Sequence, residues 1–329
     1  AIFKAGVSAD AITLGDGLNT NAHILDFTIP TGVAGFTVDG TIDGTAGDTA
    51  TITITDADNG AAGQAVTFTG IIGGGTDGVI ETLNIGTDNT LWGHAILDKA
   101  VTATNINVFG GDHSSEDAIL DVNGDVTASV TLKKTGAGGD PVMKFTGTAA
   151  QTMTGTILAT ADSNGELEVN NAAGVTFANN VGNTAAHSLT KFTNQANSKA
   201  TFNGELSAKT MTLAAGSETV ITQDANDVDT SFAPAATSIL TLANSVVATQ
   251  TVFTVGTAVA HASSGTVVLN MPANFTTGTI TLFDANSDAN DVAMFADPSN
   301  ALVTYAVALD TAATKVTATA KTAAQTAND

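Results

Sequence analysis

Short runs in which apolar and polar residues alternate follow one another along the chain. The clearest runs are "HILDFTIP", "TATITITD", "ASVTLKK", "GELEVNN" and "GTITLFDA". A period of two places successive side chains on opposite faces of an extended backbone, and threonine fills most of the polar positions, as it does in half-buried strands. The pattern predicts an all-β chain made of many short strands.

Clusters of Gly, Asn and Asp separate these strands, as in "DADNG" (56–60) and "GGGTDG" (73–78). These residues favour turns because they tolerate left-handed backbone and can cap their own amides. Strands recur about every 10 to 14 residues, a spacing typical of sandwiches, barrels and solenoids. We predict a β-solenoid of the β-helix kind. Tandem β-sandwich domains remain the alternative, because they have the same strand spacing and the same turns.

Three short motifs recur along the chain: "NGEL" at 164 and 203, "TMT" at 152 and 210, and "FTG" at 68 and 145. Their separations are close to whole multiples of a coil of about 19 to 20 residues, near the lower end of known solenoid repeats. The motif "VTF", at 66 and 175, does not fit that period. The repeats therefore favour a degenerate solenoid.

The composition changes along the chain and suggests four segments. Residues 1–125 form an N-terminal β region, and residues 126–223 form the most regular β-repeat region. Residues 224–238, in "QDANDVDTSFAPAATS", combine an acidic run with Pro234 and small residues, which predicts a linker. Residues 239–329 form a C-terminal β region. Its polar, small-residue tail is either an edge strand or a segment that becomes ordered against a neighbour.

The regular middle third contains "GELEVNNAAGVTFANNVGN" (165–183) and "KATFNGELSAKTMTLAAGS" (199–217). These stretches resemble the passenger repeats of bacterial autotransporters, in particular the surface-layer and outer-membrane-protein-B-like antigens of rickettsia-type Alphaproteobacteria. The resemblance implies a secreted β-helical surface protein and supplies no catalytic residues. The C-terminal membrane barrel of that family, with its bands of aromatic residues, is not recognisable here. We therefore expect a processed passenger or an independent surface-layer or filament subunit.

The charge of the chain limits its partners. The formal net charge is −22, the sequence pI is near 4.1, and all 10 basic residues are lysines. We expect no nucleic-acid partner, because such binding needs a basic surface that displaces counterions. Anionic membranes recruit polybasic segments and are excluded for the same reason. An acidic surface favours solubility and attracts divalent cations where carboxylates converge.

Location is inferred from three features of the sequence. The chain has no cysteine, which excludes disulfides, thiolate catalysis and cysteine-ligated metals. It has no apolar run long enough for a transmembrane helix, so we expect no membrane insertion. It begins "AIFKAGVSAD", without an initiator Met or a leader. This start suits a mature extracellular or cell-surface protein whose signal peptide has been removed.

Acidic turns are the only candidate metal sites. The segment "DANSDANDVAMFAD" places Asp and Asn at alternate positions, like the start of a calcium loop. An EF-hand is excluded, because Ala289 and Phe295 stand where the loop needs Gly and Glu. A calcium site in a β-turn and ordinary turn chemistry both remain open. The candidate ligands are Asp284, Asn286, Asp288 and Asn290, then Asp121, Asn123 and Asp125, and finally Asp56 and Asp58.

Enzyme signatures are missing from the sequence. There is no His-Glu-x-x-His, Gly-x-Ser-x-Gly or phosphate-loop motif. A β-helical polysaccharide enzyme could draw on 32 acidic residues, but the chain has no arginine to hold an acidic sugar. Apart from phenylalanine, only Trp92 and Tyr305 could stack on a sugar ring, and we expect Trp92 in the core. We therefore predict that the chain is not an enzyme.

These observations favour a secreted structural protein of a prokaryotic cell surface. We expect a surface-layer or filament subunit whose main partner is itself, with calcium as a candidate aid to assembly. Strand addition at the chain's termini would join the copies, because unpaired sheet edges must be either protected or used. A cell-surface glycan is a further candidate partner. The first alternative is an adhesin that resembles an autotransporter passenger, and the second is a polysaccharide-active enzyme.

Overall fold

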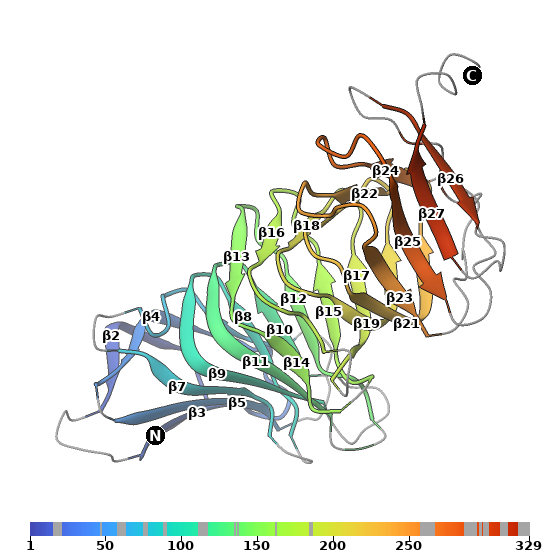
Figure 1. Cartoon of the computed structure of the whole chain (residues 1–329). Coiled ribbons are helices and arrows are strands. Elements are labelled where there is room, and N and C mark those ends of the chain that lie inside the picture. Colours follow the sequence, from blue (N-terminus) through green and yellow to red (C-terminus); the bar gives the residue numbers. More distant parts are fainter. Residues whose placement is uncertain are drawn as a thin grey trace. The chain divides into compact units, whose positions relative to one another are not determined.

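The structure is a computed structural model that describes most of the 329 residues. The described residues are 1–15, 22–46, 48–57, 64–74, 78–87, 91–110, 118–134, 136, 138–161, 163–183, 187–256, 267–285, 295, 298, 303–309 and 315–321. They contain no helix, 61% of them lie in strands, and the fold is a β-solenoid of about 9 turns (Figure 1). The all-β solenoid prediction is confirmed, and tandem sandwich domains are not found in these ranges.

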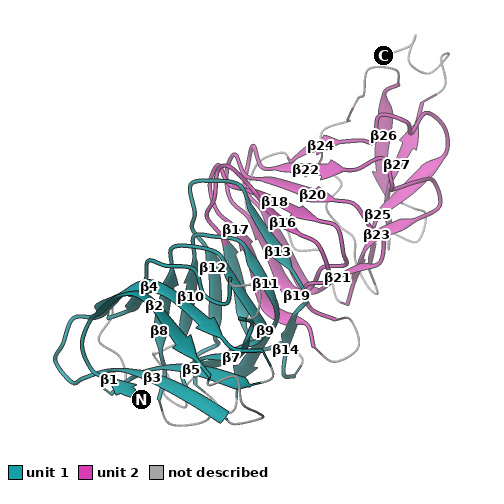
Figure 2. Ribbon diagram, turned by 90° about the vertical axis from the view of Figure 1, so that its left-hand side faces the viewer, with its two compact units in different colours: residues 1–168 teal, residues 169–329 magenta. Residues whose placement is uncertain are grey.

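The chain divides into two compact units, residues 1–168 and residues 169–329 (Figure 2). In the first unit one sheet has the order β1-β3-β5-β7-β9-β11-β13, with β14 beside β11, and a second sheet has the order β2-β4-β6-β8-β10-β12. All of these strands pair in parallel. Their bounds are β1 (Ile2–Phe3), β2 (Val7–Leu14), β3 (Ala22–Ile29), β4 (Phe36–Gly44), β5 (Thr49–Asp56), β6 (Val66–Phe68), β7 (Ile80–Ile85), β8 (His94–Leu97), β9 (Val101–Gly110), β10 (Ile119–Val122), β11 (Val126–Lys134), β12 (Val142–Phe145), β13 (Gln151–Thr154) and β14 (Ile157–Ala159).

The second unit repeats this two-sheet arrangement. One sheet has the order β16-β18-β20-β22-β24, and the other has the order β17-β19-β21-β23-β25-β27-β26. The last two strands differ, because β27 runs antiparallel to both β25 and β26. The bounds are β16 (Val175–Phe177), β17 (Leu189–Asn194), β18 (Lys199–Phe202), β19 (Ser207–Leu213), β20 (Glu218–Ile221), β21 (Asn226–Pro234), β22 (Ile239–Leu242), β23 (Thr251–Val255), β24 (Val268–Asn270), β25 (Thr279–Ala285), β26 (Tyr305–Leu309) and β27 (Lys315–Ala320); β15 (Glu166–Val169) lies at the boundary of the units in the sequence.

Apolar and polar residues that alternate along a strand place their side chains alternately in the core and on the outer face. In β18, Ala200 and Phe202 are fully buried, and the alternate residues Lys199 and Thr201 are half-buried on the outer face. Parallel pairing in register places similar side chains above one another. The rings of Phe177 and Phe202 therefore stack with centroids 4.8 Å apart, and the ring of Phe192 meets Phe202 edge-on at 5.1 Å. Trp92 is only 6% exposed, which confirms its expected place in the core.

The predicted coil length holds for only part of the chain. Around β18 and β20 the register pairs Ala200 with Thr219, one predicted coil length further on. Between β5 and β7, however, Ile52 pairs with Leu83, so this coil is much longer. The predicted coil of about 19 to 20 residues is therefore wrong for this part of the solenoid, whose coils differ in length. The strands keep their register, and the extra residues enter the connections outside the sheets.

Residues 224–238, predicted to form a linker, contain strand β21 between β19 and β23. The side chain of Asn226 is fully buried there. It accepts a 2.7 Å hydrogen bond from the backbone N–H of Leu206 and donates a 3.0 Å bond to the carbonyl of Val252. An acidic, Asn-containing run looks like a loop in the sequence, but its Asn joins adjacent coils and its aspartates face outward. The segment is part of the sheet.

The small-residue C-terminal segment contains a strand over Lys315–Ala320. The edge-strand alternative is wrong in one respect, because this strand, β27, pairs with both β25 and β26 and so lies inside the sheet. Near it, the Tyr305 ring is fully buried, and its centroid lies 5.6 Å from that of Phe275. No helix in the described part of the chain is long and apolar enough to cross a membrane.

Candidate functional site

The acidic turn after β10 was a candidate calcium site, and the structure shows where its carboxylates point. The Asp121 Oδ2 lies 2.8 Å from the Nε2 of His94 on the neighbouring strand. Both side chains are mostly buried, at 18% and 15% exposed. The Asp125 Oδ1 accepts a 2.7 Å hydrogen bond from the backbone N–H of Thr152. The two carboxylates therefore bind different neighbours.

The third candidate at this turn, Asn123, belongs to a ladder of side chains that crosses three coils. Its Nδ2 donates to the Asp98 Oδ1 at 2.8 Å, and its Oδ1 accepts from the Thr146 hydroxyl at 2.8 Å. Equivalent positions on successive coils hold all three residues, because each directly follows a paired strand. A ladder of this kind satisfies polar side chains at the edge of a solenoid without a metal.

The remaining calcium candidates are dispersed. The Asp284 carboxylate accepts from the Lys315 Nζ at 2.7 Å. Asp56 is fully buried at the end of β5, where its backbone N–H donates to the Trp92 carbonyl at 2.9 Å. Asn286, Asp288, Asn290 and Asp58 lie outside the described residues. Within the described ranges no three His, Asp or Glu side chains group as metal ligands, so a calcium site stays a prediction.

Replacing Asp125 with alanine tests whether its carboxylate has a structural role or binds a metal. Removing the hydrogen bond to Thr152 is expected to lower the free energy of unfolding by about 1 kcal/mol. Because this partner is part of the chain, we expect the same loss in calcium and in EDTA. Urea unfolding in both buffers measures the two values. A larger loss in calcium would instead place a metal ion at this turn.

The N-terminal end of the first unit exposes part of its core. Among the described residues, β2 pairs only with β4 and β1 only with β3. Val7 and Ile12 on β2 align with Val38 and Ile42 on β4. The β4 residues are fully buried, whereas both β2 residues are half-buried. The described residues therefore cover the side chains of β2 less completely than those of β4.

The outer edge of β2 has the features of a site for strand addition. The strand is 8 residues long, and no other described strand pairs with its outer edge. Unpaired backbone N–H and C=O groups in such a row form a template for another strand. On β1, Ile2 is 65% exposed, and the half-buried Phe3 stacks on Phe27 with centroids 5.6 Å apart. The first strand of the other sheet thus also carries an exposed apolar side chain.

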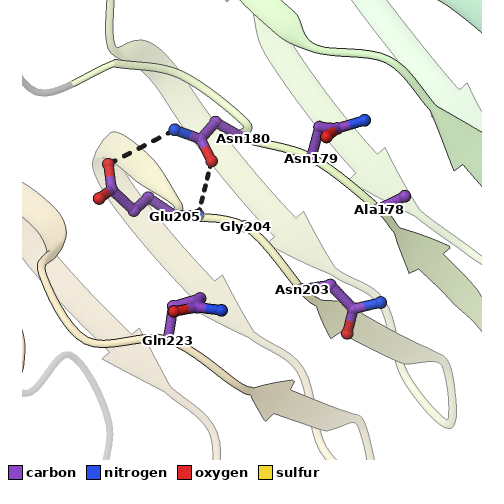
Figure 3. Close-up of a pocket in the computed structure, with 7 residues that line it drawn as sticks. All are labelled: Ala178, Asn179, Asn180, Asn203, Gly204, Glu205 and Gln223. Carbon is purple, nitrogen blue, oxygen red and sulfur yellow. Dashed lines mark hydrogen bonds between the residues drawn. The ribbon is translucent and has the colours of Figure 1, made fainter.

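A polar groove lies in the second unit where the chain leaves β16, β18 and β20 (Figure 3). Its volume is about 240 Å³. We name its side chains the amide groove; they are Asn179, Asn180, Asn203, Glu205 and Gln223, with Ala178 and Gly204 completing the lining. Successive coils supply these residues, because Phe177 pairs with Phe202 and Phe202 with Ile221 immediately before them.

One wall of the amide groove is held by a reciprocal pair. The Asn180 Oδ1 accepts from the backbone N–H of Glu205 at 3.1 Å, and its Nδ2 donates to the Glu205 Oε2 at 3.5 Å. A second hollow of about 400 Å³ adjoins the groove through Glu205 and is lined as well by Ala225, Asp227 and Thr254. The polar surface thus continues onto the next coil of the same unit.

The other three amides of the groove differ from the Asn180–Glu205 pair. In the part of the chain that the structure describes, the side chains of Asn179, Asn203 and Gln223 have no hydrogen-bond partner. Elsewhere, amides at neighbouring coils bind each other, as Asn107 Nδ2 does to Asn84 Oδ1 at 2.9 Å. Figure 3 shows the three side chains extending from separate strand ends beside the Asn180–Glu205 pair.

The sequence held one signal for this groove. Asn203 and Glu205 belong to the second "NGEL" motif, which in the sequence indicates a repeat and no binding site. Comparisons of the chain with protein-family models, with curated proteins and with solved structures found no match. The N-terminal edge and the amide groove are therefore the features that bear on function.

Proposed function

We propose that the protein is a secreted, self-assembling structural protein of a prokaryotic cell surface, as a surface-layer or filament subunit. The exposed outer edge of β2 is the observation that carries this proposal. It combines backbone groups that no other described strand pairs with and the half-buried side chains of Val7, Ile12 and Leu14. A strand from another copy would satisfy the backbone groups and cover the apolar residues in one step.

The rest of the fold supports a structural role. Each coil contacts its neighbours along the solenoid, so a growing assembly needs no change inside the subunit. The outer faces of the strands are rich in threonine and asparagine, and the described part of the chain contains no group of three metal-ligating His, Asp or Glu side chains. Such a hydrated outer surface suits a structural protein that is present in many copies at a cell surface.

Charge makes assembly sensitive to ions. Copies that each carry a formal net charge of −22 repel one another. Salt screens this repulsion, and a divalent cation between carboxylates of adjacent copies reduces it further. Calcium would then act between subunits, and an internal site would not be required. Calcium can therefore still assist assembly, as the acidic turns in the sequence suggested.

An adhesin that resembles an autotransporter passenger is the second candidate, and the amide groove is the observation that favours it. Such a protein would display the solenoid as a monomer and bind a surface ligand. Polymer formation by the purified chain separates the two functions.

Electron microscopy of the purified chain, in calcium and in EDTA, tests the proposed assembly. We expect ordered fibres or sheets in calcium and fewer in EDTA. The variant Ile12→Lys places a charge on the exposed edge and should abolish the polymers, because charged side chains block edge pairing. Ile24→Lys is the matched control, since Ile24 is 53% exposed and aligns with Thr51 of β5 in the other sheet, away from β2. This control should assemble normally.

Circular dichroism establishes that both lysine variants are folded before they are compared. Monomers of the unmodified chain in both buffers would contradict the assembly proposal. If the Ile12→Lys variant forms polymers and the Ile24→Lys variant does not, the contact between subunits does not involve β2. Polymers that form equally well in EDTA would support the structural role and show that assembly does not need calcium.

A further inference from the structure

We propose that the amide groove of the second unit binds a neutral glycan. The proposal rests on the arrangement of Asn179, Asn203 and Gln223, and it holds whether or not the protein assembles. Each side chain follows a different strand of one sheet, β16, β18 or β20. Adjacent strands lie about 4.8 Å apart, so the amides extend over roughly 10 Å along the solenoid. A groove of this form suits an extended chain of hydroxyl-bearing units.

The chemistry of the groove selects the ligand class. An amide side chain both donates and accepts hydrogen bonds, which matches sugar hydroxyls that do the same. Three amides in the groove are exposed and have no partner in the described part of the chain, so binding would displace water from them without breaking hydrogen bonds within the protein. The wall pair adds a carboxylate oxygen of Glu205, a strong acceptor for a hydroxyl.

The same lining argues against the other ligand classes. The groove has no lysine or histidine, so an acidic glycan or a phosphate would find no counter-charge there. Calcium needs about 6 to 8 oxygen ligands with several carboxylates among them, and Glu205 is the only acidic residue of this lining. An apolar ligand would leave the amides buried and unpaired.

Gly204 allows two coils to approach closely beside the groove. A Cβ at this position would lie 2.4 Å from the backbone carbon of Asn179 and 2.5 Å from the backbone nitrogen of Asn180. Substituting Gly204 would therefore disturb the fold as well as the groove. The amide side chains can be shortened without such a clash, which makes them the better positions for a test.

Binding of the full chain to neutral and acidic glycans tests the proposal. The neutral probes are dextran, laminarin, mannan, and cello- and chito-oligosaccharides, and the acidic probe is polygalacturonate. We expect saturable binding to at least one neutral glycan, measured by calorimetry and affinity electrophoresis. The double variant Asn203→Ala and Gln223→Ala should weaken it about tenfold or more, since each substitution removes hydrogen bonds to the ligand.

Two controls test whether binding is specific to the amide groove and to glycans. Asn270→Ala removes an amide from β24 of the same unit, away from the groove, and should leave binding unchanged. Amide signals in NMR spectra, recorded with calcium chloride alone, report any metal in the groove. The proposal is overturned if the chain binds none of the neutral probes, or if the double variant binds as well as the unmodified chain. It is also overturned if calcium chloride alone shifts the NMR amide signals of the groove residues. Preference for polygalacturonate would also overturn it.

Discussion

Replacing Phe202 with alanine is expected to lower the free energy of unfolding by about 3 to 5 kcal/mol. The Phe202 ring is fully buried, stacks on Phe177 with the two planes 10° apart, and contacts Phe192 edge-on. The substitution removes the buried surface and leaves a cavity lined by both neighbouring rings. Their stacked and edge-on contacts add to the loss, because such pairs contribute beyond their buried area.

Urea unfolding followed by circular dichroism measures this effect. Thr201→Ala is the matched control, because Thr201 is the adjacent residue on β18 and its half-buried side chain faces outward. We expect it to change stability by about 0.5 kcal/mol or less. Similar losses for the two variants would mean that the Phe202 stack does not stabilise the core as the structure indicates.

Gly155→Ala should destabilise the chain by at least about 2 kcal/mol through backbone strain and a steric clash. Gly155 lies between β13 and β14 with φ at +115°, a conformation that L side chains rarely adopt. A Cβ there would lie 1.9 Å from the carbonyl oxygen of Ala128, so the two coils would have to separate. The same place on β11 has a register irregularity between Thr127 and Ser129.

Gly32→Ala separates the two contributions to that loss. Gly32 also has a positive φ, at +74°, but a Cβ there would meet nothing within 4 Å. We expect this control to lose only about 1 kcal/mol, the conformational part of the cost. Thermal unfolding of both variants gives the comparison. Equal losses at the two positions would contradict the close approach of the coils at Gly155.

The sequence predicted strands well because their alternation directly reflects which side chains enter the core. The run "TATITITD" became β5, where Ile52 and Ile54 are fully buried between outward threonines. It could not predict the coil length. Pairing of Ile52 with Leu83 depends on their meeting in space, and nothing along the chain marks the connection between them as one solenoid turn.

Buried polar residues are the main reason for the remaining differences. Asn226 stands in an acidic run and looks like a turn residue, yet its side chain bonds to backbone groups on two neighbouring coils. The amide groove escaped prediction for a related reason. Asn179, Asn203 and Gln223 each resemble ordinary turn chemistry, and only the stacking of three coils brings them together.

The unequal coils have a consequence for how this fold can change. Ala200 and Thr219 pair across a short coil, whereas Ile52 and Leu83 pair across a much longer one, and in both cases the paired strands stay parallel and in register. Extra length is therefore absorbed where the chain turns, outside the packed core, and loop closure becomes only slowly more costly as a loop grows. Natural variation can lengthen a turn to carry a new epitope, and an engineer can graft a peptide there, while the stacked strands below remain the same scaffold.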